Sequence, residues 1–365
     1  MSEIRCNNCL RPYPDHGVPF ICSTCGGYYD FEEIQFLPPT PSNETWNQGI
    51  WRYRRTFNLP DDAPVITLGE GMTPLVWSTL FDKEVAFKVE SSNPTGSYKD
   101  RGSAVLASFL CFRGVKSAVE DSSGNAGASF AAYATRSGIQ ASIYVPSSAS
   151  GTKVTQIQAY GGKLVQIPGS RSETAAAVRQ AAENGAYYAS HAFLPQGLYG
   201  YATLAYEIFE QLGCAPGTLI APVGQGNLLL AIGRGFQALQ KSGLLDHMPA
   251  LVGVQARVCA PLWAVFHYGP SGFGWVTEDS SLAEGVIVRY PVRGDGLIKM
   301  IEQTGGTVIA VDEEDILRGR NQLARIGLYV EPTSALVWSA LLQGKNIFKE
   351  PIVSVLTGSG LKVSN

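Results

Sequence analysis

Four cysteines near the start of the chain stand in two closely spaced pairs. Cys6 and Cys9 form one Cys-x-x-Cys pair, and Cys22 and Cys25 form the second after a segment of hairpin length. Thiolates are preferred zinc ligands, and two such pairs can bring four sulfur atoms to one tetrahedral point. Disulfide bonds are the alternative, and a reducing compartment disfavours them. The spacing therefore predicts a zinc ribbon within residues 1–36.

The charges around these cysteines argue against nucleic-acid binding by the ribbon. Arg5 and Arg11 are accompanied by more numerous acidic residues, namely Asp15, Asp30, Glu32 and Glu33. The whole chain has a formal net charge of −3 and no long run of Lys or Arg. Neither a nucleic acid nor a membrane surface is therefore an expected partner, and we expect the ribbon to have a structural role.

A lysine follows a tight turn at the predicted start of a helix. Asn93-Pro94 and Gly96 indicate the turn, Lys99 comes soon after it, and an Ala- and Leu-rich stretch then indicates the helix. A lysine amine can form a Schiff base with an aldehyde and later move protons. Taken without its surroundings, a solvated Lys99 paired with Asp100 is the simpler interpretation.

Two further segments place small polar residues or glycines between a strand and a helix. Ser122, Ser123 and Asn125 follow the strand-like residues 117–120, and Gly224 and Gly226 follow the strand-like residues 218–221. Ordinary helix caps and strand-to-helix turns have the same composition. The functional alternative is an anion held by backbone amides at a helix N-terminus. The second segment is not a full dinucleotide-binding fingerprint, because its third glycine is missing.

Alternating strand-like and helical segments must position these groups. The strand-like segments include 141–145, 163–167, 218–221 and 251–255, and the helical ones include 151–160 and 171–184. Such alternation predicts an α/β protein with parallel sheets and helices on both faces. Residues 37–63, with three closely spaced prolines, are predicted as a linker, and 64–365 as the main body.

The remaining features indicate the compartment. The chain begins without a basic segment followed by an apolar one, and it has no apolar run of 18 residues. We therefore expect neither a signal peptide nor a membrane span. Cys111, Cys214 and Cys259 are scattered single cysteines, which suits a reducing compartment. We expect a cytoplasmic protein.

Six motifs, in the same order, resemble those of the fold-type II pyridoxal-5′-phosphate (PLP) enzymes and of the threonine synthase family in particular. The most specific is Asn-Pro-Thr-Gly-Ser-Tyr-Lys-Asp-Arg-Gly at 93–102, which differs from the family segment by Tyr98 in place of Phe. The others lie at 68–75, 121–127, 224–228, 331–335 and 357–362. The resemblance runs from about Leu68 to the C-terminus.

The resemblance implies roles for individual residues. Lys99 would carry PLP as a Schiff base, Asn125 would contact the cofactor 3-hydroxyl, and Thr357 would meet the pyridine nitrogen. Ser122 and Ser123 would bind the substrate carboxylate. The loop that would cup the cofactor phosphate consists of Gly224, Gln225, Gly226, Asn227 and Leu228.

The resemblance also implies an architecture. It is that of a fold-type II PLP enzyme: two parallel-sheet α/β lobes with the cofactor between them, the smaller lobe at about 96–200 inserted in the larger, preceded here by the small zinc ribbon. Similar ribbons precede some threonine synthases. A homodimer acting on a small amino-acid substrate is expected.

Three further positions depart from the family pattern. Ala202 stands where the family has a Lys, Ser359 replaces a His, and the segment at His191 lacks the family's Asn-Pro. The substrate of the family carries a phosphate dianion, which calls for cations or several donors. Lys153 and His191 are therefore candidates to replace the missing lysine. For Lys153, a solvated helix residue is an equal alternative.

The function implied by the resemblance is conversion of O-phospho-L-homoserine and water to L-threonine and phosphate. A related PLP lyase, such as a serine/threonine ammonia-lyase or a β-replacement synthase, is the alternative, and Ala202 and Ser359 favour it. A zinc-ribbon binding protein with an inactive enzyme body is a third class, which the presence of Lys99 disfavours.

Overall fold

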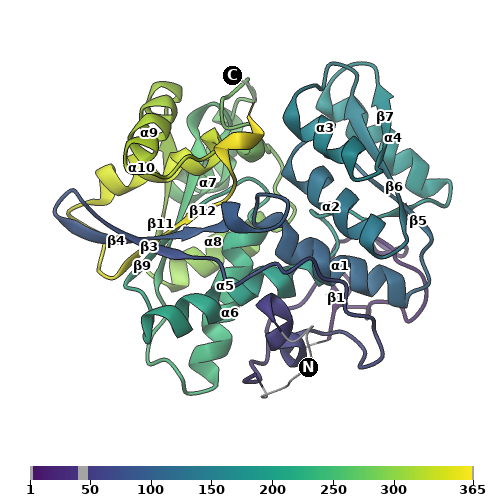
Figure 1. Ribbon diagram of the computed structural model, residues 1–365, viewed down its shortest axis with the longest axis horizontal. Helices are drawn as coiled ribbons and strands as arrows, with labels where there is room; N and C mark the ends of the chain where they lie inside the picture. Colours follow the sequence, from purple (N-terminus) through teal and green to yellow (C-terminus); the bar gives the residue numbers. More distant parts are fainter. Residues whose placement is uncertain (1–2, 40–47, 364–365) are drawn as a thin grey trace. The chain divides into compact units, whose positions relative to one another are not determined.

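A computed structural model describes residues 3–39 and 48–363 (Figure 1). The described residues fall into two compact units. Unit 1 takes its residues from 1–71, 93–201 and 363–365, and unit 2 consists of 72–92 and 202–362. Among the described residues, no helix is both long enough and apolar enough to cross a membrane.

Unit 1 is built on a four-stranded parallel sheet with the strand order β7-β6-β5-β8. The strands are β5 (Ser117–Glu120), β6 (Gln140–Pro146), β7 (Lys163–Ile167) and β8 (Tyr187–Tyr188). Its helices are α1 (Lys99–Phe112), α2 (Asn125–Arg136), α3 (Thr152–Ala159) and α4 (Arg171–Glu183). Helix α4 connects the edge strand β7 to β8 at the opposite edge of the sheet. Because crossover connections are right-handed, α4 lies on the other face of the sheet from α2 and α3.

Unit 2 contains a six-stranded sheet with the order β11-β10-β9-β12-β4-β3, in which only the edge strand β3 is antiparallel. The strands are β3 (Leu75–Leu80), β4 (Lys83–Val89), β9 (Thr218–Pro222), β10 (Ala250–Ala256), β11 (Thr307–Val311) and β12 (Ile352–Leu356). The helices are α6 (Asn227–Lys241), α7 (Pro261–Tyr268), α8 (Gly294–Gln303), α9 (Glu313–Arg325) and α10 (Pro332–Gly344). Every residue of β9 and β12 is buried, as expected for central strands covered on both faces.

Several shorter elements complete the description. Helix α5 (Gln196–Leu212) begins in unit 1 and continues into unit 2. The 3₁₀ segments are η1 (Gly49–Thr56), η2 (Glu90–Ser92), η3 (Arg257–Cys259), η4 (Pro270–Trp275), η5 (Glu284–Val286) and η6 (Gly360–Lys362).

The strands and helices predicted from sequence are confirmed to within one or two residues at their ends. Strand β6 and helix α3, for example, match the predicted segments 141–145 and 151–160. Where the structure describes it, the predicted linker includes the 3₁₀ segment η1 (Gly49–Thr56). Residues 40–47 lie outside the described part, but η1 buries Trp51 and Tyr53 completely.

The N-terminal segment packs against the rest of unit 1 through aromatic rings. Its two short strands, β1 (Arg5–Cys6) and β2 (Tyr29–Asp30), pair in antiparallel fashion. Phe31 stacks on Tyr199 with ring centroids 4.3 Å apart, and Phe20 meets Tyr188 edge-on at 5.1 Å. Aromatic pairs of this kind add stability beyond their buried area. The segment thus contacts both α5 and β8.

Candidate active site

Lys99 is the first residue of α1, and the loop before it is fixed by the buried carboxylate of Asp100. That carboxylate accepts hydrogen bonds from the Thr95 backbone amide and from the Ser129 hydroxyl on α2, both at 2.6 Å. Lys99 Nζ itself lies 4.9 Å from the ring centroid of Tyr98 and 6.0 Å from that of Tyr201. Asp100 therefore holds the loop and α2 together, and the solvated Lys99–Asp100 pair considered above is not formed.

The loop that resembles the substrate-carboxylate site begins directly after β5. Ser122 is buried, and Ser123 and Asn125 are half-buried at the first turn of α2. The residue before that helix is Gly124, which provides no side-chain cap for the first-turn amides. Because uncapped amides at a helix N-terminus attract anions, this loop suits a carboxylate.

A second feature of the Lys99 loop points to a bound ligand. Ser97 is fully buried, and its Oγ has no hydrogen-bond partner in the structure. An unpaired buried hydroxyl costs free energy, so a ligand group that pairs with it would recover that cost. Ser97 lies two residues before Lys99, where the aldehyde-derived part of PLP would be attached. This observation fits PLP.

The glycine loop of unit 2 forms the N-terminus of α6. Gly226 has φ +83° and precedes the helix without capping it by a side chain. Gly224 lies so close to η5 that a Cβ atom there would come within 2.7 Å of the Gly285 carbonyl oxygen. Gln225 is held from the side, since its Oε1 accepts a hydrogen bond from the Val292 amide at 3.1 Å. The loop leaves backbone amides of α6 for a phosphate, and the helix dipole adds to the attraction.

Thr357 ends the buried strand β12 and is itself buried. Its hydroxyl lies 2.9 Å from the hydroxyl of Ser334 and 3.4 Å from Glu331 Oε1. The Ser334 hydroxyl also accepts a hydrogen bond from the Gly358 backbone amide at 2.9 Å. The Thr357 hydroxyl donates to Glu331 Oε1 in the structure, and it could give the same hydrogen bond to a pyridine nitrogen instead.

The motif at 68–75 has a structural role that the sequence did not reveal. The buried Glu70 accepts hydrogen bonds from Trp51 Nε1 at 2.9 Å, from the Tyr133 hydroxyl at 2.7 Å and from the Leu68 amide at 3.0 Å. Tyr133 lies on α2, the helix that begins at Asn125. Glu70 therefore ties η1 to the helix that carries one of the proposed site residues.

The candidates for binding the substrate phosphate have different surroundings. Lys153 is half-buried in the first turn of α3, one turn before Gln156, whose amide donates to the Thr95 carbonyl at 3.1 Å. Because residues three apart share a helix face, Lys153 lies on the side of α3 that meets the Lys99 loop. Ala202, by contrast, is fully buried and has no polar side chain to offer.

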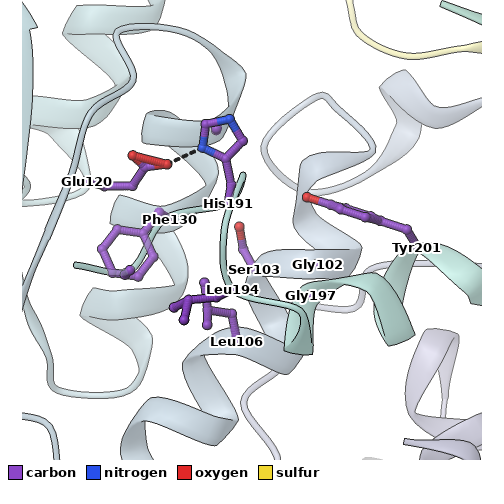
Figure 2. Close-up of a pocket in the computed structure, with 11 residues that line it drawn as sticks. Gly102, Ser103, Leu106, Glu120, Phe130, His191, Leu194, Gly197 and Tyr201 are labelled. Carbon is purple, nitrogen blue, oxygen red and sulfur yellow. Dashed lines mark hydrogen bonds and ion pairs between the residues drawn. The ribbon is translucent and has the colours of Figure 1, made fainter. Parts of the chain in front are cut away.

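His191 is paired with a carboxyl group that the sequence analysis did not single out. His191 Nδ1 lies in hydrogen-bonding contact with Oε1 of Glu120, the last residue of β5 (Figure 2). Burial raises the pKa of Glu120 to about 7, against the opposing effects of backbone amides and Lys99. Burial also lowers the pKa of His191 well below its ordinary value, and Lys99 lowers it further. Both effects favour the neutral form of His191, whereas a replacement cation would have to be protonated.

The four N-terminal cysteines come together as their spacing predicts. Their sulfur atoms all lie within 4.8 Å of one another, with Cys6 and Cys25 at 3.4 Å and Cys9 and Cys22 at 3.7 Å. A tetrahedral zinc site with Zn–S bonds of about 2.3 Å separates its sulfurs by ~3.8 Å. Backbone amides of Thr24 and Cys25 point at the Cys22 sulfur, as is common around structural thiolates. The geometry fits a metal ion.

Gly102 makes room for the ring of Tyr201, and its substitution gives a direct test of this part of the site. A Cβ atom on Gly102 would lie 2.4 Å from Tyr201 Cζ. We expect Gly102→Ala to lower the stability of the fold by about 1–3 kcal/mol, because overpacking outweighs the helix propensity that Ala adds. Urea unfolding measures the change.

The matched control is Gly296→Ala, which lies inside α8 with its nearest atom 4.0 Å from the new Cβ. This variant should be as stable as the wild type or more so. Equal stability of the Gly102→Ala and Gly296→Ala proteins would contradict the close packing of Tyr201 on α1.

The sequence matches the family described as pyridoxal-phosphate dependent enzyme over residues 66–358, which is most of the chain. The strand order, the lysine at the start of α1 and the glycine loop at α6 agree with that class, and the chain is a member of it. Threonine synthase of Methanocaldococcus jannaschii is 31% identical over 98% of this chain and 92% of its own. Threonine synthase of Mycobacterium bovis is 32% identical over 89% of this chain and 91% of its own. Within the class, the chain belongs to the threonine synthase family.

Solved structures agree on the fold. A threonine deaminase from T.th. has a TM-score of 0.67 at 24% identity, covering 80% of this chain and 94% of its own. A maize serine racemase has a TM-score of 0.68 at 22% identity, covering 80% of this chain and 88% of its own. At these identities the likeness establishes the fold-type II architecture and not the substrate.

Proposed function

We propose that this protein is a threonine synthase, which converts O-phospho-L-homoserine and water to L-threonine and phosphate. The observation that carries the proposal is Lys99 at the start of α1, in a loop held by Asp100 and directly beside α2 and its Ser122–Asn125 segment. The family membership agrees with it over nearly the whole chain.

The proposal assigns roles to residues of both units. Lys99 would hold PLP covalently through its amine, and Asn125 would donate to the cofactor hydroxyl. The backbone of Gly224, Gln225, Gly226, Asn227 and Leu228 would hold the cofactor phosphate. Thr357 would bind the ring nitrogen, and Ser122, Ser123 and Lys153 would bind the substrate's anionic groups.

PLP supplies an electron sink that makes protons at substrate carbons acidic. The contribution of the chain is to orient the substrate and move those protons. Lys99, once its amine is released by the substrate, is the group placed to take and return a proton at the substrate carbons. The amides at the start of α2 would keep the substrate carboxylate fixed during these transfers.

An assay of phosphate release from O-phospho-L-homoserine tests the function, with threonine as the accompanying product. A parallel assay follows ketoacid formation from L-threonine. The alternative, a serine/threonine ammonia-lyase or a β-replacement synthase, is favoured by the buried Ala202 in place of a family Lys. Ketoacid formation without phosphate release would replace the proposal with that alternative.

The residue at the ring nitrogen decides which chemistry a PLP enzyme favours. A carboxylate at position 357 would hold a proton on that nitrogen, which a neutral hydroxyl does not do. We therefore expect Thr357→Asp to bind PLP and to shift products several-fold from elimination and replacement toward racemisation or transamination. Cofactor absorbance and product ratios measure both.

Glu331 affects how this variant is interpreted, because it lies 3.4 Å from the Thr357 hydroxyl. The new carboxyl group would therefore stand next to an existing one. Ser334→Ala is the control, since it removes a neighbour of Thr357 without adding charge. An unchanged product distribution in Thr357→Asp with PLP bound would mean that Thr357 is not the nitrogen partner.

The domain organisation and assembly are part of the proposal. We infer a zinc ribbon at 1–36, a connecting segment at 37–63 and a PLP-dependent body at 64–365, with a smaller lobe at about 96–200. The clustering of four thiols supports the zinc ion. A homodimer in the cytoplasm is expected, and the free thiols suit a reducing compartment.

A further inference from the structure

The pair formed by Glu120 and His191 lines a small pocket of unit 1. The pocket has a volume of about 10 Å³, close to the minimum that holds one water molecule. Its wall also includes Gly102 and Ser103, one turn along α1 from Lys99, and Tyr201 from α5. Figure 2 shows the hydroxyl of Tyr201 pointing toward the side of the pocket where His191 and Ser103 lie.

The topology places this pair at the same sheet edge as the proposed carboxylate loop. Glu120 ends β5 and leads directly into Ser122 and Ser123, and His191 follows the parallel neighbour strand β8. Ligands of open parallel sheets bind at the carboxyl ends of the strands. Lys99 is near enough to affect the charge of both Glu120 and His191. The pair therefore belongs to the neighbourhood of the reacting amine.

Other charged and titratable groups surround the pair. Asp121 follows Glu120 and accepts a hydrogen bond from the Tyr188 hydroxyl of β8 at 2.6 Å. Burial raises the pKa of Asp121 to about 6, and the nearby charge of Glu120 is a second, smaller cause. Arg171 of α4 and Lys99 of α1 favour the ionised form of Glu120. On the α5 side, burial holds the pKa of Tyr201 well above its ordinary range. Glu120 and the neighbouring Asp121 are therefore the groups of this cluster that change their charge closest to neutral pH, and Glu120 is the one in direct contact with His191.

The reaction of the proposed function creates a need for such a pair. When the bond between the substrate carbon and the phosphate oxygen breaks, the electron pair stays on that oxygen. A phosphate dianion would then leave as the trianion, which is a strong base, unless it receives a proton. A positioned acid typically accelerates such a step by about 10²–10⁴-fold.

We propose that His191 is the catalytic acid that protonates the departing phosphate oxygen, and that Glu120 is the positioning residue that supplies His191 with its proton. His191 Nε2 gives its proton to the oxygen, and the Glu120 proton moves to Nδ1. The pair resets when the Nδ1 proton returns to the Glu120 carboxylate and Nε2 takes a new proton from solvent admitted to the pocket. This inference rests on the proposed function and adds a specific acid to it.

The proposal gives a pH dependence with a definite sign. The active form needs the proton on Glu120, and it is present below the raised pKa of that carboxyl. Turnover should therefore fall as the pH rises through about 7. In Glu120→Gln, the amide still donates a hydrogen bond to Nδ1 but cannot release a proton. Turnover should therefore fall about tenfold or more, and it should no longer decrease as the pH rises through about 7.

A change of leaving group separates acid catalysis from a purely structural role. Sulfate leaves as a weak base and needs no proton, so O-sulfo-homoserine is the matched substrate for the holoenzyme. His191→Asn should lower turnover of the phosphate ester about 10²-fold and of the sulfate ester far less. An equal loss on both esters, or no loss on the phosphate ester, would overturn the proposal.

A spectroscopic measurement tests the pair without relying on turnover. The chain has four histidines, so selective ¹⁵N labelling of histidine with His191→Asn as reference identifies the His191 signals. They should change between the two neutral tautomers near pH 7, and this change should vanish in Glu120→Gln. Absence of phosphate release in the wild type would refute the proposed function, whereas normal release with pH-independent His191 signals would refute only the acid assigned here.

Discussion

We expect Lys99→Ala to lower turnover by about 10³-fold or more and to abolish the covalent attachment of PLP, while the protein keeps its fold. The loss is large because one amine serves both to attach the cofactor and to move protons at the substrate carbons. The fold should survive because Lys99 is half-buried at the first position of α1, and the Asp100 hydrogen bonds that hold the loop do not involve its side chain. Ala is also a good helix former.

The measurement is borohydride reduction of the holoenzyme, followed by peptide mapping of the labelled lysine. The control is Lys153→Ala, which should keep the label on Lys99 even if its affinity for substrate falls. Lys88 is a second informative position, because its amine is fully buried against Glu207 at 2.8 Å and should not react. A label on any lysine other than Lys99 would disprove the assignment.

The second large effect is expected from the N-terminal cysteines. Changing Cys22 and Cys25 together to Ser should reduce the bound zinc from one ion per chain to none. Apparent binding energies of structural zinc sites are about 10–16 kcal/mol, which is comparable to the whole stability of a domain. Without the metal, the two-stranded pairing of β1 and β2 should therefore be lost.

This loss should extend beyond the ribbon itself. Tyr13 packs against Phe109 of α1, and Phe20 and Phe31 pack against Tyr188 and Tyr199. Unit 1 should therefore unfold at a lower temperature in the double variant. Metal analysis and thermal unfolding are the measurements. Cys214→Ser, at an exposed cysteine outside the cluster, is the control and should change neither. Unchanged zinc content in the double variant would rule out the site.

The sequence by itself determined the local elements and the groups with reactive potential. Apolar runs predicted strands such as β9 and β10, because central parallel strands are apolar on both faces. The two Cys-x-x-Cys pairs predicted a four-sulfur cluster, since the ligand set lies in short sequence motifs. Lys99 was identified by its segment, where the resemblance outweighed the simpler interpretation of a solvated lysine.

Only the tertiary structure decided which residues distant in the sequence form hydrogen-bonded pairs. Glu70 and Trp51 meet only because the chain folds back, and so do Glu120 and His191, which are 71 residues apart. Their pairing carries no local signal, because a strand-end carboxylate looks the same in sequence whether it is solvated or buried. The lowered pKa of His191 likewise could not be predicted from the sequence. It depends on burial and on Lys99, and both are properties of the folded chain.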